Sequence, residues 1–175
     1  MRIFAISDLH IDYKENRDWI SGLSGQEYIN DVLIVAGDIC DKPKELIRTF
    51  ITLRKKFRRV LFVPGNHDLW VNRTDCNDSV LSYENIINIA REHDIDTQPV
   101  TMGKLTIIPL LGWYDYTFGK PTPMLVSSWL DYTYCKWPGD FKDKDVTSYF
   151  LAINEQYLTI KNEKIISFSH FLPRI

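Results

Sequence analysis

The sequence predicts an α/β protein in which buried strands alternate with amphipathic helices, and two observations support that prediction. Short, continuous apolar runs recur along the chain, as expected for strands that are covered on both faces. Between them lie segments with apolar residues at every third or fourth position, which is the spacing of a helix with one buried side. Strand and helix patterns in alternation are typical of sheets layered against helices.

Five apolar runs are strand candidates. None of them alternates between apolar and polar residues, so we expect both faces of each strand to be buried. The third run ends at Pro64 and Gly65, which stop a strand and turn the chain. The five candidates are residues 3–6, 32–36, 60–63, 105–111 and 165–168.

Three segments carry helical periodicity, and one long segment carries none. Pro43 suits the first position of the first helix, because proline has no amide hydrogen to leave unpaired there. The predicted helices are residues 44–57, 79–93 and 145–160, with apolar stripes at Leu46, Phe50, Leu53 and Phe57, at Val80, Tyr83, Ile87 and Ala90, and at Val146, Phe150, Ile153, Tyr157 and Ile160. Residues 112–139 are rich in Trp, Tyr and Pro, and we interpret them as a long, partly ordered loop near the active face. Core packing explains these aromatic residues, with a substrate lid or a partner surface as the alternative.

The length and composition predict a single domain spanning residues 1–175. The 21 basic and 23 acidic residues give a net charge of −2, which provides no long-range attraction for nucleic acid. The three cysteines, Cys40, Cys76 and Cys135, lack the spacing of a disulfide framework or a thiolate zinc site. No leader-like segment or membrane-spanning apolar run occurs. These features predict a cytoplasmic protein without a membrane partner, and they leave its oligomeric state open.

Four of the apolar runs end directly in side chains that bind metals or transfer protons. In α/β sheets, ligands bind at the carboxyl ends of the strands, so we expect these loops to converge on one crevice. Gly37 and Gly65 lie within two of the loops and allow the backbone to turn sharply. The side chains concerned are Asp8, His10, Asp38, Asp41, Asn66, His67 and His170.

The chemistry of this set points to metal ions that assist phosphoryl transfer. Mixed nitrogen and oxygen ligands suit Mn²⁺, Fe, Zn²⁺ or Co²⁺ better than Mg²⁺ or Ca²⁺, which prefer oxygen alone. One carboxylate can bridge two cations, and two cations about 3.5–4 Å apart clamp the attacking and leaving oxygens. Each residue alone is weak evidence for a metal site, because an Asp after a strand is usually a turn former. The combination of four motifs in this order argues against chance.

The motifs Asp8-Leu9-His10, Gly37-Asp38-Ile39-Cys40-Asp41 and Gly65-Asn66-His67-Asp68, with a later His170 and Pro173, resemble those of calcineurin-like metallophosphoesterases. The resemblance covers nearly the whole chain. It implies an α/β/β/α sandwich with two divalent metal ions, Mn, Fe or Zn, at the carboxyl ends of the strands. It also implies that Asp8 and His10 bind the first metal, Asp38 bridges, and Asn66 and His170 bind the second.

The same resemblance implies a catalytic role for His67, outside the metal ligands. His67 would contact the substrate phosphate and protonate the leaving oxygen, with Asp41 as the residue that orients it. An imidazole is suited to that proton transfer near neutral pH. The expected activity is hydrolysis of a small-molecule phosphomonoester or phosphodiester by a metal-activated hydroxide. A nuclease is the alternative within enzymes, and the negative net charge disfavours it.

The chain departs from the family pattern in its histidines. The family normally adds a closing Gly-His-x-His block, and the only histidines besides His170 are His10, His67 and His93. We therefore expect the domain to be incomplete at its C-terminal end and to bind metal more weakly than a full member. The alternative is a complete domain with an under-coordinated site. The alternative function is a catalytically weakened scaffold or protein-binding module on the same fold. Lys42, Pro43 and Asp68 also differ from the protein phosphatases of the superfamily and favour its other phosphoesterases.

Overall fold

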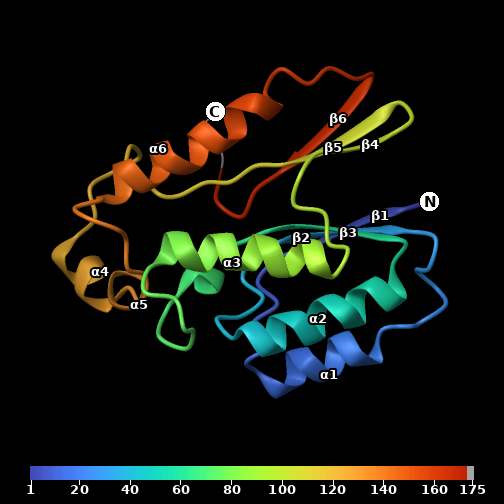
Figure 1. Cartoon of the computed structure of the whole chain (residues 1–175), viewed down its shortest axis with the longest axis horizontal. Coiled ribbons are helices and arrows are strands. Elements are labelled where there is room, and N and C mark those ends of the chain that lie inside the picture. Colours follow the sequence, from blue (N-terminus) through green and yellow to red (C-terminus); the bar gives the residue numbers. More distant parts are fainter. Residues whose placement is uncertain (173–175) are drawn as a thin grey trace.

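Figure 1 shows the computed structural model of the chain, which describes residues 1–172 and contains two three-stranded sheets and several helices. The first sheet is parallel, in the order β1 (Ile3–Ile6), β2 (Val32–Ala36), β3 (Arg59–Val63). In the second, β5 (Leu105–Pro109) lies between an antiparallel β4 (Val100–Met102) and a parallel β6 (Lys164–Phe168). The helices are α1 (Lys14–Gly22), α2 (Pro43–Lys56), α3 (Ser79–Glu92), α4 (Pro123–Ser128), α5 (Asp131–Tyr134) and α6 (Asp143–Asn154). Pro173 of the fourth motif lies outside the described residues.

The two faces of β2 show why its sequence is continuously apolar. Val32 and Ile34 pack toward the second sheet, in one cluster with Ile107 of β5. Leu33 and Val35 belong to the other cluster, which the apolar stripe of α2 completes. A central strand covered on both sides has no face that favours polar residues. The prediction that residues 32–36 form a strand buried on both faces is confirmed. The predicted α/β architecture is confirmed as well.

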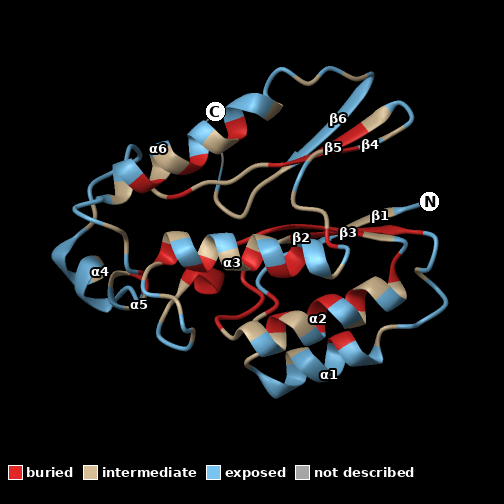
Figure 2. Ribbon diagram, viewed as in Figure 1, coloured by how far each residue is buried: buried red, intermediate tan, exposed pale blue. Residues whose placement is uncertain are grey.

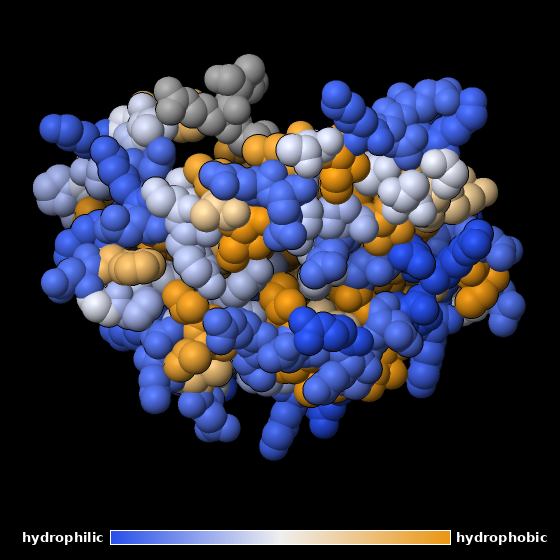
Figure 3. All heavy atoms as spheres, turned by 45° about the horizontal axis from the view of Figure 1, so that its top comes forward, coloured by the Kyte–Doolittle hydropathy of each residue, from blue (hydrophilic) through white to orange (hydrophobic). Residues whose placement is uncertain are grey.

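All five predicted strands form, but the expected burial of the first and the last is wrong. In β1, Ala5 is exposed and the other three residues are half-buried. In β6, Ile165 is 46% exposed and Ile166 is 36% exposed. The strand lies at the edge of its sheet and, within residues 1–172, pairs with β5 alone. Figure 2 shows it exposed along its length, in contrast to β2 and β3. Elsewhere on the surface, on the face in Figure 3, apolar side chains lie in separate patches among polar ones.

The sequence analysis missed β4 and α1, because each has only a weak sequence pattern. β4 has three residues and turns into β5 at Gly103, whose φ of +63° suits glycine. α1 buries only Ile20, so no apolar stripe marks it. Among residues 1–172, no helix has both the length and the apolar character needed to cross a bilayer.

The three predicted helices form, with two differences. The buried face of α3 includes Ser82, Ile86 and Ile89, a face rotated from the predicted stripe. α6 ends at Asn154 rather than continuing to residue 160, and a short 3₁₀ turn follows. The Asn154 side chain is buried because its amide accepts from the Leu111 N–H at 2.9 Å and donates to the Leu111 carbonyl at 2.8 Å. That pair of bonds fixes the end of the helix against the chain leaving β5.

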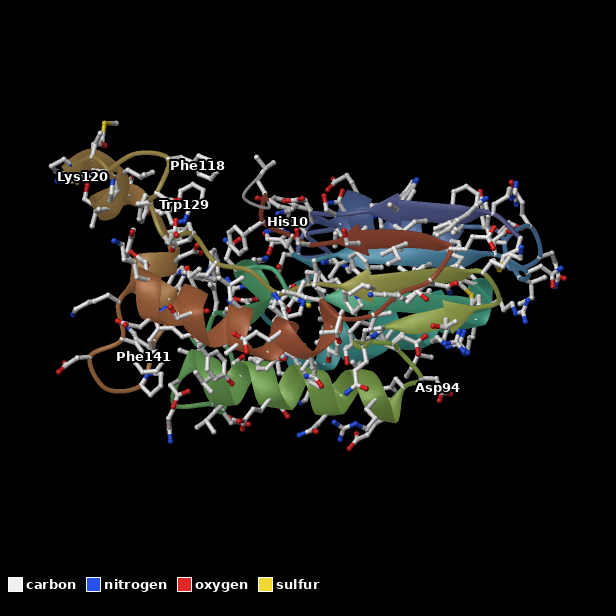
Figure 4. The ribbon with its side chains drawn as sticks, turned by 90° about the horizontal axis from the view of Figure 1, so that it is seen from above. His10, Asp94, Phe118, Lys120, Trp129 and Phe141 are labelled. Atoms are coloured by element: carbon white, nitrogen blue, oxygen red, sulfur yellow. The ribbon has the colours of Figure 1, made fainter. Side chains whose placement is uncertain are left out.

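The segment predicted as a loop, residues 112–139, contains the short helices α4 and α5. Its aromatic residues divide between the core and the surface. Trp113 is buried and Trp137 packs against the same core, as the core-packing interpretation requires. Phe118 and Trp129 are exposed, and they extend beyond the end of the sheets at which His10 lies (Figure 4).

A buried carboxylate joins the loops that follow β2 and β3. Asp68, which is 2% exposed, accepts hydrogen bonds of 2.8–2.9 Å from the backbone N–H groups of Asp38, Ile39, Cys40 and Gly65. Burial and the neighbouring Asp38 charge raise the pKa of Asp68, whereas the N–H donors lower it, and the net result is a pKa of about 7. The four donors belong to the segments that carry Asp38 and Asn66, so this side chain sets their relative position.

We expect Asp68→Ala to lower the free energy of unfolding by at least about 3 kcal/mol, because four buried N–H groups lose their acceptor. Urea unfolding followed by circular dichroism measures the loss. Asp78→Ala is the matched control, since Asp78 caps α3 by accepting from only two N–H groups and should cost about 1 kcal/mol. Equal losses in the two variants would contradict the central role of Asp68.

Candidate metal centre

The loops that follow β1, β2, β3 and β6 bring the five predicted ligands together. One ligating atom from each of Asp8, Asp38 and His170 lies within 4.8 Å of the others. His10 Nε2 is 3.8 Å from oxygens of both Asp8 and Asp38. Asn66 Oδ1 lies 3.0 Å from His170 Nε2. The expected convergence at the strand ends is therefore present, while the ligand role of each residue stays a prediction.

His170 presents a lone pair to the centre of this cluster. Its Nδ1 lies 2.8 Å from the Ala36 carbonyl, which can only accept, so Nδ1 carries the proton. In the neutral ring Nε2 is then an acceptor, and it lies 3.0 Å from Asn66 Oδ1 and 3.5 Å from Asp38 Oδ1. Three acceptor atoms with no hydrogen between them repel one another. A cation among them would convert that repulsion into coordination, so this donor set fits a metal ion.

The electrostatics of Asp38 favour a cation at the same place. Burial raises the pKa of Asp38, because the ionised form loses its hydration. The positive charge that His170 carries when it is protonated acts in the opposite direction, as does the N–H of His67, which donates to Asp38 Oδ1 at 3.0 Å. A divalent ion beside the carboxylate would strengthen that second effect and keep Asp38 ionised.

Three of the predicted ligands occupy strained backbone positions. Asp8, His10 and Asp38 have φ values of 54°, 38° and 57°, in the left-handed region that side chains with a Cβ rarely adopt. Each such residue costs on the order of 1–3 kcal/mol. Hydrogen bonds between the loops hold them, because the Asp8 N–H donates to the Gly37 carbonyl and the His10 N–H to the Asp38 carbonyl.

Gly37 and Gly65, the two glycines of these loops, leave room for neighbouring side chains of the site. A Cβ on Gly37, whose φ is +82°, would lie 2.6 Å from His170 Nδ1. A Cβ on Gly65 would lie 2.1 Å from Asp38 Oδ1. Glycine at these positions leaves the space that the Asp38 and His170 side chains occupy.

Gly65→Ala should displace the Asp38 side chain and weaken Mn²⁺ binding by at least about tenfold, because coordination is sensitive to ligand position. Isothermal titration calorimetry with Mn²⁺ measures the affinity. Gly25→Ala is the control, since a Cβ there meets no atom within 4 Å. Unchanged affinity in Gly65→Ala would show that Asp38 does not bind the ion.

His67 lies beside the cluster in a second group of titratable side chains. It is 8% exposed, and its Nδ1 is 3.1 Å from His10 Nδ1. On the other side of the ring, Nε2 lies 3.7 Å from Asp12 Oδ2, and Asp41 offers an oxygen within 4.8 Å of both. The structure thus brings the predicted orienting residue, Asp41, close to His67. It adds Asp12, which the sequence analysis missed because Asp12 belongs to no motif that was identified.

Beside His67, Asp41 is buried and Asp12 is half-buried, and basic side chains compensate their charges only in part. Arg73 lies 3.5 Å from Asp12 and 3.3 Å from Asp41, and Lys42 lies 2.7 Å from Asp12. One oxygen of each carboxylate has no hydrogen-bond partner within residues 1–172. Burial lowers the pKa of His67, while the charges of Asp38 and Asp41 raise it. Because nearby negative charge raises the pKa of His67, a bound anion would favour the protonated imidazole.

A pair of stacked sheets with carboxylate, imidazole and amide ligands at the strand ends defines the metallophosphoesterase class of proteins. The sequence profile described as calcineurin-like phosphoesterase matches residues 1–171. The chain belongs to that family. Its predicted membership and its metallophosphoesterase-type fold are thereby confirmed.

Two comparisons with individual proteins lead to the same relative. The chain is 32% identical over 125 residues to the [acyl-carrier-protein] phosphodiesterase PptH of Mycobacterium tuberculosis (strain ATCC 25618 / H37Rv), a match that covers 66% of this chain and 38% of that protein. It is also similar to the crystal structure of phosphopantetheinyl hydrolase (PptH) from Mycobacterium tuberculosis, with a TM-score of 0.76 and 25% identity. That match covers 97% of this chain and 68% of the other. The sequence match thus spans less than half the length of this relative.

Proposed function

We propose that this protein hydrolyses a phosphoester with two divalent metal ions, held by Asp8, His10, Asp38, Asn66 and His170. The observation that carries the proposal is the convergence of acceptor atoms from Asp38, Asn66 and His170 beside the buried His67. Mn, Fe or Zn suits the mixed nitrogen and oxygen donors. Bound there, such ions would supply a nucleophile at neutral pH and neutralise charge on the phosphoryl oxygens.

The residues of the protein then position the phosphate and move the proton. His67 lies next to the ligands and remains neutral when burial dominates its pKa. A bound phosphate brings negative charge, which raises the pKa of the imidazole and prepares it to protonate the leaving oxygen. Asp41 and Asp12 lie beyond the ring, where a carboxylate partner would fix its tautomer and orientation.

We further propose a phosphodiester as the substrate, with a phosphomonoester as the less favoured alternative. The named activity of the relative from Mycobacterium tuberculosis is that of a phosphodiesterase acting on an acyl carrier protein. That relative is 32% identical over 125 residues of this chain, which supports a similar bond as the target here. A phosphodiester that joins a small organic group to a carrier protein is therefore the first substrate class to test, followed by small diesters.

A scaffold with weakened catalysis is the second candidate. The observation in its favour is that the 175 residues contain four histidines and no Gly-His-x-His block. The retained His67, buried next to the predicted ligands, favours the enzyme.

The three cysteines support the proposed cytoplasmic setting. All three are free thiols, and Cys40 and Cys135 are buried. Burial raises the pKa of both thiols, so they remain protonated and unreactive. Free thiols of this kind are typical of reducing compartments.

His67→Ala should reduce turnover by about 10²–10⁴-fold while leaving metal content unchanged, because its role is proton transfer. His170→Ala, by contrast, should lower metal content. Elemental analysis by mass spectrometry, with hydrolysis of bis(p-nitrophenyl) phosphate, separates the two effects. Loss of metal from the His67→Ala protein would make our assignment of His67 as a non-ligand wrong.

Hydrolysis of bis(p-nitrophenyl) phosphate should exceed that of p-nitrophenyl phosphate, disappear with EDTA and return with Mn²⁺. The diester and the monoester share a leaving group, so their ratio reports on the substrate charge that the site accepts. The His67→Ala protein controls for hydrolysis by free metal. If the wild-type protein binds Mn²⁺ and hydrolyses neither compound nor a carrier-protein phosphodiester, the scaffold becomes the better account.

A further inference from the structure

Asp131 is a buried carboxylate that accepts four hydrogen bonds, and it lies outside both the cluster of predicted metal ligands and the group around His67. It is 2% exposed and is the first residue of the short helix α5. Its Oδ1 accepts from Asn66 Nδ2 at 3.0 Å and from Trp70 Nε1 at 2.7 Å. Its Oδ2 accepts from Trp129 Nε1 at 2.8 Å and from Tyr114 OH at 3.3 Å. All four partners are N–H or O–H donors, so both carboxyl oxygens of Asp131 act as hydrogen-bond acceptors.

The bond to Asn66 determines which end of that amide faces the metal centre. An amide presents an oxygen on one side and two N–H donors on the other, and only the oxygen can bind a cation. With Nδ2 held by Asp131, Oδ1 lies 3.0 Å from His170 Nε2, among the converging acceptors. An amide turned by half a rotation would direct its N–H groups at the ion instead.

The same carboxylate contacts the surroundings of His67. Trp70, which donates to Asp131, packs edge-on against the His67 ring with centroids 4.3 Å apart. On the opposite oxygen, Trp129 is 46% exposed and belongs to the segment that extends beyond the His10 end of the sheets (Figure 4). Asp131 thus links three parts of the structure: the amide of Asn66, the Trp70 ring that packs on His67, and Trp129 of the 112–139 segment.

We propose that Asp131 is a positioning residue of the metal centre, which acts through Asn66 by fixing the direction of its amide oxygen. The inference rests on the proposed function, because it takes Asn66 and its neighbours to be metal ligands. Its test does not, because it measures metal binding rather than hydrolysis.

Asp131→Asn should weaken Mn²⁺ binding by about 10- to 100-fold, the usual effect of removing the partner of a metal ligand. An asparagine of the same shape offers one acceptor oxygen to four donors. Trp70, Trp129 and Tyr114 then compete with Asn66 for that oxygen, and the Asn66 amide is no longer held in one orientation. Isothermal titration calorimetry gives the affinity, and thermal unfolding without metal shows that the variant is folded. Asp143→Asn is the matched control, because Asp143 accepts from Tyr132 OH in the same region, and its affinity should equal the wild type.

A double-mutant cycle with Asn66→Ala decides whether Asp131 acts through Asn66. In the Asn66→Ala background, Asp131→Asn should weaken Mn²⁺ binding no further, since there is no amide left to orient. Wild-type affinity in Asp131→Asn, or a full additional loss in the double variant, would overturn the proposal.

Asn66→Asp provides a second test that does not depend on how well the Asp131 variant folds. A carboxylate at position 66 adds a charge that favours Mn²⁺, but it cannot donate to Asp131 and is repelled by it. We expect weaker binding than in the wild type, with partial recovery in the Asn66→Asp, Asp131→Asn double variant. Tighter binding in Asn66→Asp would contradict a positioning role. If the wild-type protein binds Mn²⁺ with these dependences and lacks hydrolytic activity, the proposed function fails while the role of Asp131 stands.

Discussion

The Asp68 carboxylate holds together the loops after β2 and β3, and the arrangement of the candidate site depends on it. Its four backbone N–H bonds fix the segments of Asp38 and Asn66 relative to each other. Because these bonds are buried, water does not replace them cheaply, and the loops lose their common acceptor if the side chain is removed. A left-handed residue such as Asp38, with φ of 57°, persists where its surroundings fix the backbone in this way.

A second constraint is the accumulation of acceptors within that frame. Asp38, Asn66 and His170 direct lone pairs at the same place, and the His170 proton is occupied by the Ala36 carbonyl. Without a cation this arrangement is repulsive, so a bound ion would stabilise the folded chain as well as equip it for chemistry. The metal centre and the fold of these loops are therefore coupled through electrostatics.

Two buried carboxylates thus support the candidate metal centre in different ways. Asp68 organises backbone, and Asp131 orients a side chain and reaches toward the exposed Trp129. The first is local in the chain, with partners no more than 30 residues away, whereas Asp131 lies 65 residues from Asn66. The exposed Trp129 of the 112–139 segment is therefore linked to Asn66 of the metal centre through one buried side chain, that of Asp131.

The sequence by itself determined the α/β class, the positions of five of the six strands in residues 1–172 and the candidate ligands at the strand ends, because continuous apolar runs and adjacent motifs are local patterns. It also identified His67 and Asp41 as neighbours of the site. Only the tertiary structure decided the rest: the exposed edge of β6, and the positions of Asp12 beside His67 and of Asp131 beside Asn66. Strand pairing at a sheet edge and a carboxylate contributed from another segment depend on long-range packing, and no periodicity or spacing in the chain records such contacts.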